Sequence, residues 1–307
     1  MESGTLALGN LKGEFDLQST VESGQSYLWR REDGRMYEQT PAYGGEAWYY
    51  TVLPGTYADG DPAVLRVRQR GDKLEWESQF DAAETLGHLL RLDDDLPAIF
   101  DAIPTDPLVD AAYDAYEGMR LVRDPPFQTL ISFICSAQMR VARIHQMQLG
   151  LARTFGEKVE FDGRAYHAFP TPEALAGASE AQLRNLNLGY RAPYVQRSAE
   201  IVAQGLAHPE DAVGLDYENA REELKTFVGV GDKVADCVLL FSLGYLEAVP
   251  LDTWIQSAIA DHYPDCDQGN YTNTSRSIRA QFGGEYAGYA QTYVFHYLRT
   301  GGPANDE

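Results

Sequence analysis

The segment from residue 224 to residue 254 constrains the fold of this 307-residue chain more than any other. Apolar residues recur at three- and four-residue spacing in 224–227 and again in 234–243, which predicts a helix on each side of the Gly-Val-Gly sequence at 229–231. So short a connection favours a sharp helix–hairpin–helix. Its glycines permit positive φ and the close approach of another backbone, and the free N–H groups that begin the second helix suit a phosphate. The hairpin is therefore predicted to hold a phosphodiester backbone.

Lys233 and Asp252 stand on either side of the second apolar run and suit covalent chemistry. Only five of the 25 basic residues are lysines. A lysine kept among so many arginines indicates a need for an amine, because a guanidinium cannot lose its proton to become a nucleophile. An amine and a carboxylate near a phosphate clamp suit Schiff-base chemistry at a sugar carbon. Taken singly, each residue also fits an ordinary role: Lys233 as an exposed helix lysine and Asp252 as a helix N-cap.

Four further blocks accompany the hairpin. They are SGQSYLW at 23–29, FICS at 133–136 followed by VARI at 141–144, LGYRA at 188–192 and YAGYAQ at 286–291. With GVGDKVADC and VPLD, these blocks resemble the helix–hairpin–helix DNA glycosylases over about residues 10 to 300, and most closely the 8-oxoguanine DNA glycosylase/AP lyases. The Gly-Val-Gly turn alone is a weak signal, whereas the blocks in this order are a strong one.

The sequence pattern predicts an α+β protein. Alternating residues at 64–68 and 74–77 predict a β-hairpin, 26–30 and 47–52 predict further strands, and turns are expected at Asp33-Gly34 and Gly44-Gly45. From about residue 81 the pattern is helical, and no later strand is expected. Asp124 is predicted to cap the helix that follows it. The expected helices cover about 126–136, 140–155, 172–177, 180–186, 192–205, 217–227, 232–243, 253–262, 272–281 and 285–299.

This pattern divides the chain into three parts. We expect an N-terminal antiparallel β-sheet subdomain with one or two helices at 1–104, a helical glycosylase region at 105–300 and an acidic tail at 301–307.

The net charge of −21 opposes simple DNA binding, because basic surface normally supplies affinity for phosphates. Either nucleic acid is not the partner, or the acidity suits a salt-rich cytoplasm. Scarce lysine, abundant Asp and Glu, and high Ala and Gly resemble haloarchaeal proteins and favour the second interpretation. In molar salt the Debye length is about 3 Å, so distant acidic residues would hardly repel DNA.

Composition also limits cofactors and location. Three widely spaced cysteines argue against disulfides or zinc and exclude the iron–sulfur form of the superfamily. Six scattered histidines lack metal-ligand spacing, so no metal or cofactor is expected; the resemblance implies that a hairpin of this family can hold a monovalent cation through main-chain carbonyls. There is neither an 18-residue apolar run nor a basic-then-apolar leader, which predicts a soluble intracellular protein with no membrane partner. The resemblance implies a cytoplasmic, nucleoid-associated location, and nothing in the sequence suggests more than a monomer.

The resemblance assigns roles to individual residues. Lys233 and Asp252 would be catalytic: the amine attacks C1′ of a flipped nucleotide, the carboxylate steadies the charge on the sugar, and the Schiff base permits β-elimination. The damaged base, 8-oxoguanine opposite cytosine in double-stranded DNA, would lie in a pocket of four residues. These are Gly24, Cys237, Gln291 and Phe295. Contacts to DNA would come from Gln138, Arg143, Tyr190, Arg191, Gly229, Val230, Gly231 and Trp254.

The implied contacts differ in kind. Arg143 and Arg191 would read the estranged cytosine, and Tyr190 would wedge beside it, although arginines in so acidic a chain also fit surface ion pairs. The chain departs from the family at Gln138, which stands where the first of three asparagines is usual, and at Trp254, which replaces a phosphate-contacting histidine. Both departures bear on opposite-base preference and on how DNA is held.

Three other functions fit parts of the pattern. An alkylated-base glycosylase of the same fold, of the 3-methyladenine type, needs only the aspartate and an aromatic cup. A non-catalytic DNA-binding module could reuse the hairpin. An acidic enzyme without a DNA partner would explain the charge. Lys233 and the GQS block argue against the first, and the presence of both Lys233 and Asp252 argues against the second.

Overall fold

The computed structural model describes residues 1–38, 46–58 and 60–301. Within them the N-terminal part forms an antiparallel sheet of five strands in the order β1-β5-β4-β3-β2. The strands are β1 (Glu2–Ala7), β2 (Arg30–Arg31), β3 (Tyr49–Leu53), β4 (Ala63–Arg70) and β5 (Lys73–Ser78). The predicted hairpin is confirmed, because β4 and β5 pair from Leu65 opposite Ser78 to Arg70 opposite Lys73.

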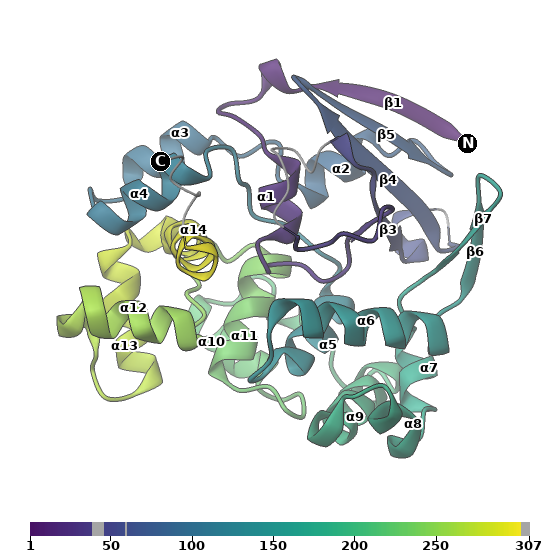
Figure 1. The fold of residues 1–307 in the computed structure, drawn as a ribbon. Helices are drawn as coiled ribbons and strands as arrows, with labels where there is room; N and C mark the ends of the chain where they lie inside the picture. The colour runs from purple at the N-terminus through teal and green to yellow at the C-terminus, as the bar shows by residue number, and fades with distance from the viewer. Residues whose placement is uncertain (39–45, 59, 302–307) are drawn as a thin grey trace.

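Figure 1 shows this sheet, with α1 and α2 beneath it, beside a larger group of helices. The helices packed on the sheet are α1 (Leu17–Glu22) and α2 (Ala83–Leu89), whereas α3 (Leu96–Ala102) and α4 (Pro107–Ala115) pack in the core of the larger group of helices. The next are α5 (Pro126–Ser136), α6 (Val141–Phe155), α7 (Pro172–Ala176), α8 (Glu180–Asn185) and α9 (Ala192–Ala203). The last are α10 (Tyr217–Leu224), α11 (Asp232–Val238) with a π-helical continuation (Leu239–Leu243), α12 (Thr253–His262), α13 (Tyr271–Gln281) and α14 (Ala287–Thr300). The predicted α+β class is confirmed.

Two faces of the sheet are covered by different parts of the chain. Leu65 and Val67 of β4 pack with α1 and α2 in one core cluster. Val64, on the other face, packs against a second hairpin formed by β6 (Lys158–Phe161) and β7 (Arg164–His167). The expectation of no strand after residue 81 is therefore wrong. These short strands are stabilised by packing on a distant sheet, which a local pattern does not reveal.

Residues 26–30 are the second correction, because the strand they were predicted to form begins only at Arg30. Gly24 has φ +99° and turns the chain away from the sheet. Gln25 is buried, and its amide donates 2.8 Å hydrogen bonds to the carbonyls of Thr20 and Arg120 and accepts one from the Val122 N–H. The side chain thus supplies bonds that a strand would make through its backbone.

Asp124 was predicted to cap α5, and this is also wrong. Pro125 occupies the N-cap position. Asp124 instead points into the interior, where its carboxylate accepts a hydrogen bond from the Ser26 hydroxyl and burial raises its pKa to about 7. Its N–H donates to the Phe241 carbonyl at 2.9 Å. Asp124 therefore joins the GQS segment to the helical region.

Other expected details have mixed outcomes. The turn at Asp33-Gly34 is confirmed, since the Gly34 N–H donates to the Arg31 carbonyl at 3.1 Å, whereas Gly44-Gly45 lies outside the described residues. Helix α10 ends at Leu224 rather than near 227. Gly301 closes α14 in a left-handed conformation, and 302–307 are not described. No helix of the described chain is long and apolar enough to cross a bilayer.

Candidate active site

The helix–hairpin–helix is formed by α10, the 229–231 turn and α11. Gly229 has φ +85°, and a Cβ atom there would lie 2.7 Å from the Tyr194 side chain, so only glycine fits this position. Val230 is buried beneath the turn. Gly231 is the N-cap of α11, and the space around its missing Cβ is open to 4 Å. The turn thus buries Val230, places Gly229 against Tyr194 and leaves the backbone of both glycines exposed.

A cavity of about 1040 Å³ lies between this hairpin, the α5–α6 turn, α14 and the start of α12. It is lined by ten of the fourteen residues predicted for the site. These are Gly24, Gln138, Gly229, Gly231, Lys233, Cys237, Asp252, Trp254, Gln291 and Phe295. The volume matches that of pockets that enclose small organic groups.

Lys233 points into this cavity from α11. Its Nζ donates a 3.0 Å hydrogen bond to Ser136 Oγ at the end of α5 and lies 5.4 Å from the centroid of the Phe133 ring. The Ser136 hydroxyl in turn donates to the Phe133 carbonyl at 2.7 Å, so its lone pair is directed to the amine. Lys233 is half-buried, and it is not the exposed helix lysine of the ordinary interpretation.

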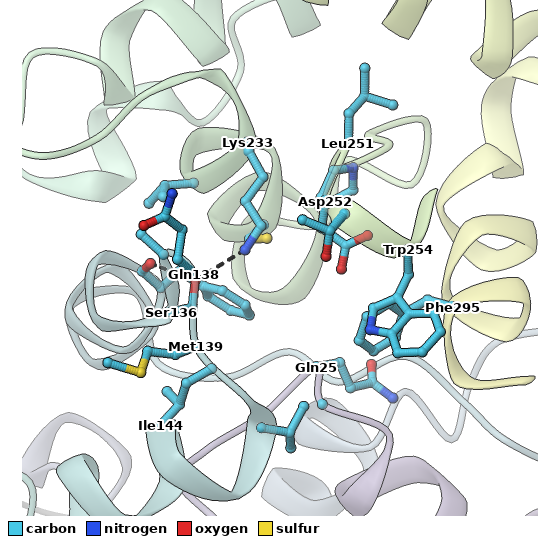
Figure 2. Close-up of a pocket in the computed structure, with 18 of the residues that line it drawn as sticks. Gln25, Ser136, Gln138, Met139, Ile144, Lys233, Leu251, Asp252, Trp254 and Phe295 are labelled. Carbon is cyan, nitrogen blue, oxygen red and sulfur yellow. Dashed lines mark hydrogen bonds between the residues drawn. The ribbon is translucent and has the colours of Figure 1, made fainter. Parts of the chain in front are cut away.

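Asp252 enters the same cavity from the loop before α12. It is the N-cap of α12, with Oδ1 accepting the Ile255 N–H at 2.9 Å, so the capping role and the cavity position hold together. Burial raises the pKa of the carboxyl, opposed by the Ile255 N–H and by the positive charge of Lys233. Figure 2 shows the Lys233 and Asp252 side chains directed into one space.

Three of the predicted base-pocket residues, Gly24, Gln291 and Phe295, come from other segments that line the cavity, whereas Cys237 lies on α11 beside Lys233. A Cβ added to Gly24 would lie 3.2 Å from Phe295 and 3.1 Å from Val141, so the glycine keeps this space free. Gln291 is buried and accepts a 3.2 Å hydrogen bond from the Thr292 hydroxyl. Burial raises the pKa of the Cys237 thiol to about 12, which keeps it neutral and apolar in character.

Four predicted DNA contacts do not line the cavity. Tyr190 is 49% exposed and Arg143 is exposed on α6. Arg191 is 3% exposed, and its guanidinium donates to the carbonyls of Ala137 and Leu188, so it is tied to the α5–α6 turn. Val230 is the fourth.

The cavity also contains residues that the sequence argument did not assign. Tyr37 has φ +65°, its N–H donates to Glu22 Oε2 at 2.7 Å, and its hydroxyl reaches the Ser26 carbonyl at 3.4 Å. No local pattern marks this residue. Tyr27, Ser136 and Phe133 also line the cavity, and all three lie in the sequence blocks that carry the family resemblance, which is the signal that could have found them. Among the described residues no group of histidine, cysteine or carboxylate side chains could hold a metal ion.

Comparisons with known proteins agree with this geometry. The model of the 8-oxoguanine DNA glycosylase N-terminal domain matches residues 7–130, and that of HhH-GPD superfamily base excision DNA repair proteins matches 131–281. A probable N-glycosylase/DNA lyase of Methanothermobacter thermautotrophicus is 30% identical over 94% of this chain and 95% of its own length. The N-glycosylase/DNA lyase of Saccharomyces cerevisiae is 33% identical over 89% and 74%.

A solved structure gives the same result. The 8-oxoguanine glycosylase/lyase of Clostridium acetobutylicum, in complex with double-stranded DNA containing cytosine opposite 8-oxoguanine, superposes with a TM-score of 0.79 at 29% identity, covering 94% of this chain and 92% of that one. Fold and site thus define a helix–hairpin–helix base-excision repair enzyme. Within that superfamily, the chain belongs to the family of N-glycosylase/DNA lyases.

Proposed function

We propose that this protein is a bifunctional DNA glycosylase/AP lyase that flips 8-oxoguanine out of double-stranded DNA, opposite cytosine, and excises it. The observation that carries the proposal is the meeting of Lys233 and Asp252 in one cavity that can enclose a base. An enzyme that acts on a base within a duplex must first extrude it. A solved structure with this fold is an 8-oxoguanine glycosylase/lyase in complex with DNA that contains this lesion opposite cytosine.

Lys233 is the nucleophile of the proposed reaction. Its neutral amine attacks C1′, so an N–C1′ bond forms as the C1′–N9 bond breaks and the base leaves with the electron pair. Asp252, opposite, stabilises the positive charge that develops on the sugar. The nitrogen lone pair then forms the C1′=N bond of the Schiff base as the C1′–O4′ bond breaks, and O4′ takes up the proton that the nitrogen releases. The Schiff base acidifies C2′, so its proton passes to solvent, the electron pair forms a C2′=C3′ bond, and the 3′ phosphate leaves with the electrons of its bond to C3′.

The base pocket discriminates through shape and hydrogen bonding. 8-Oxoguanine carries a hydrogen on N7, where guanine carries a lone pair. The Gly24 carbonyl is the proposed acceptor for that hydrogen, and a misplaced polar group in such a pocket costs about 1–3 kcal/mol. Phe295 and the neutral Cys237 thiol flank the ring, and Gln291 pairs with the Watson–Crick edge.

Contacts to the opposite strand come from the α5–α6 turn and its neighbours. Gln138 lies in the cavity wall with φ +54°, at a turn suited to fill the space that the base leaves. Arg143 is exposed for contact with the estranged cytosine, while Arg191, which is buried, supports the turn through its hydrogen bond to the Ala137 carbonyl. Tyr190 and Trp254 are 49% and 41% exposed, as surfaces that stack on DNA require.

The acidic composition is proposed to reflect life in a salt-rich cytoplasm of the haloarchaeal kind. With a net charge of −21, the protein would repel DNA in dilute buffer, and binding should therefore improve as potassium chloride rises from low concentration. This trend is opposite to the usual loss of affinity on counterion release. A duplex-binding titration across salt concentrations measures it.

No cofactor takes part in the proposed reaction. Excision should accordingly continue in excess EDTA. A monovalent cation at the hairpin carbonyls would reveal itself as weaker DNA binding when potassium is exchanged for a bulky organic cation at equal ionic strength.

A lesion panel tests the function. Duplexes containing 8-oxoguanine or 3-methyladenine, each opposite cytosine, thymine, adenine and guanine, are incubated with the protein at high potassium. The proposal predicts excision of 8-oxoguanine with preference for cytosine opposite it, followed by strand cleavage. Preferential release of 3-methyladenine would establish the alkylated-base alternative, and binding without release of any base would establish the non-catalytic one.

A further inference from the structure

Asp236 is a fully buried carboxylate on α11, one turn beyond Lys233. It accepts hydrogen bonds from two tyrosine hydroxyls, with Oδ1 to Tyr217 and Oδ2 to Tyr271, each 2.7 Å long. Neither the base pocket nor the amine needs this carboxylate directly. Because Asp236 lies on the helix that carries Lys233, the role of the two tyrosines that bind it calls for an explanation.

Only one of these two tyrosines also contacts the loop that carries Asp252. The Tyr271 hydroxyl, while donating to Asp236, accepts the backbone N–H of Leu251 at 3.1 Å. Leu251 immediately precedes Asp252. The same loop has two further restraints: the Leu251 carbonyl accepts from Gln256 Nε2 at 3.1 Å, and the Asp252 N–H donates to the Pro250 carbonyl at 3.0 Å. These two lie within the loop and the start of α12, so of these three restraints only the Tyr271 hydrogen bond links the loop to α11.

The Tyr217 branch leads away from the cavity. Its ring is covered by the guanidinium of Arg279, 4.1 Å from the ring centroid, and by that of Arg221 at 5.3 Å. Tyr217 does not line the cavity, whereas Tyr271 does. The two hydroxyls therefore make equal bonds to one carboxylate and differ in what lies beyond them.

We propose that Tyr271, held by Asp236, is a positioning residue that sets the Asp252 carboxylate against the Lys233 amine. The proposal rests on the function given above. Two hydrogen bonds join the helix that carries the amine to the loop that carries the carboxylate, so they fix the separation of the reacting groups. Geometry of this kind matters because a misplacement of about 1 Å can cost about 100-fold in rate.

Tyr271→Phe tests this, because it keeps the ring and removes only the hydroxyl. The expected result is a fall of about 10- to 100-fold in the single-turnover rate of 8-oxoguanine excision at saturating enzyme, with the Kd for lesion DNA within about 2-fold of wild type. Tyr217→Phe is the matched control, since it deletes the other hydroxyl on the same carboxylate. Its rate should stay within about 2-fold of wild type. Equal losses in both variants would show that the tyrosines only hold Asp236 and would overturn the proposal.

A second comparison asks whether Tyr271 acts through Asp252. In an Asp252→Asn background, Tyr271→Phe should change the residual cleavage of an abasic-site duplex by less than about 2-fold, because the carboxylate to be positioned is gone. If Tyr271→Phe caused its full loss of activity in the Asp252→Asn background as well, the hydroxyl would act on something other than Asp252, and the inference would be contradicted.

Thermal unfolding at high potassium is measured for each variant, as a control that it folds. If Tyr271→Phe does not fold, Asp236→Asn replaces it, since one amide oxygen remains to accept a hydroxyl; it should lower the rate without weakening DNA binding, and an unchanged rate would refute the proposal. Failure of the proposed function looks different: the wild-type protein would then release no base at all.

Discussion

The two sides of the cavity are built in contrasting ways. The catalytic side, with Lys233 and Asp252, comes from one continuous segment, 229–254, and its polar groups have fixed partners in Ser136 and in the Ile255 N–H. The opposite side, which would read the base and its partner, is assembled from distant segments, with Cys237 as the one base-pocket residue that the catalytic segment supplies. It uses residues with left-handed backbone, namely Gly24, Tyr37 and Gln138. Chemistry is thus encoded locally, whereas recognition depends on long-range packing.

Replacement of the Lys233 amine, which belongs wholly to the catalytic side, should produce the largest effect. Lys233→Gln is expected to lower base excision and strand cleavage by at least about 10³-fold, because the nucleophile is lost. Lesion DNA should still bind, since the opposite side is untouched. Gel-based excision and a binding titration measure both, with Lys158→Gln as control because Lys158 is an exposed lysine paired with Glu160. Equal losses in the two variants would contradict the assignment.

His145 lies beneath the recognition side, where its Nε2 hydrogen-bonds the Trp29 carbonyl at 3.1 Å and its ring contacts Tyr37. Burial lowers its pKa from 6.5 to about 4. The unfolded chain therefore takes up the proton first, and stability present above about pH 6.5 is lost as the pH falls to about 4, by on the order of 3 kcal/mol. The His145→Gln variant should lose less stability over this pH range. Chemical unfolding of both proteins from pH 7 to 4 measures the difference, and parallel curves would refute it.

Gly24→Ala sharpens the comparison from the recognition side. The new methyl group meets Phe295 and Val141 at about van der Waals distance or closer and requires φ near +99°. Excision of 8-oxoguanine should fall by about 10- to 100-fold, while cleavage at an abasic site, which has no base to accommodate, should fall less. Gly34→Ala is the control, because Gly34 also has positive φ but faces open space. An equal fall in both activities would mean that Gly24 serves folding and not recognition.

The smallest of these effects belongs to the α5–α6 turn. Gln138→Ala leaves nothing to fill the vacated space and should reduce excision about tenfold at limiting enzyme. Gln138→Asn should stay within about 2-fold of wild type, because asparagine tolerates left-handed backbone and keeps the amide. Excision opposite each of the four bases provides the measurement. Unchanged activity in Gln138→Ala would remove this residue from the site.

The same contrast explains what the sequence could predict. The hairpin and α11 follow from local spacing and glycine preferences, and they were predicted correctly. The N-cap role of Asp252 was only the alternative interpretation of that residue, and the structure combines it with a position in the cavity. Residues whose position depends on distant partners were not predicted correctly. Asp124 turns inward because Ser26 reaches it, and β6 and β7 form where the sheet offers Val64 and Val52. Tyr37 enters the cavity from a left-handed position that Glu22 stabilises. None of these contacts leaves a periodic signal in the sequence.

The most direct test of the account is to find which amine joins the DNA. The protein is mixed with an 8-oxoguanine duplex at high potassium, reduced with borohydride and digested, and the cross-linked peptide is identified by mass spectrometry. With only five lysines in the chain, the assignment is clear-cut. The account predicts one adduct, on the peptide containing Lys233. An adduct on another lysine or on the terminal amine, or excision at full rate with no adduct, would contradict it.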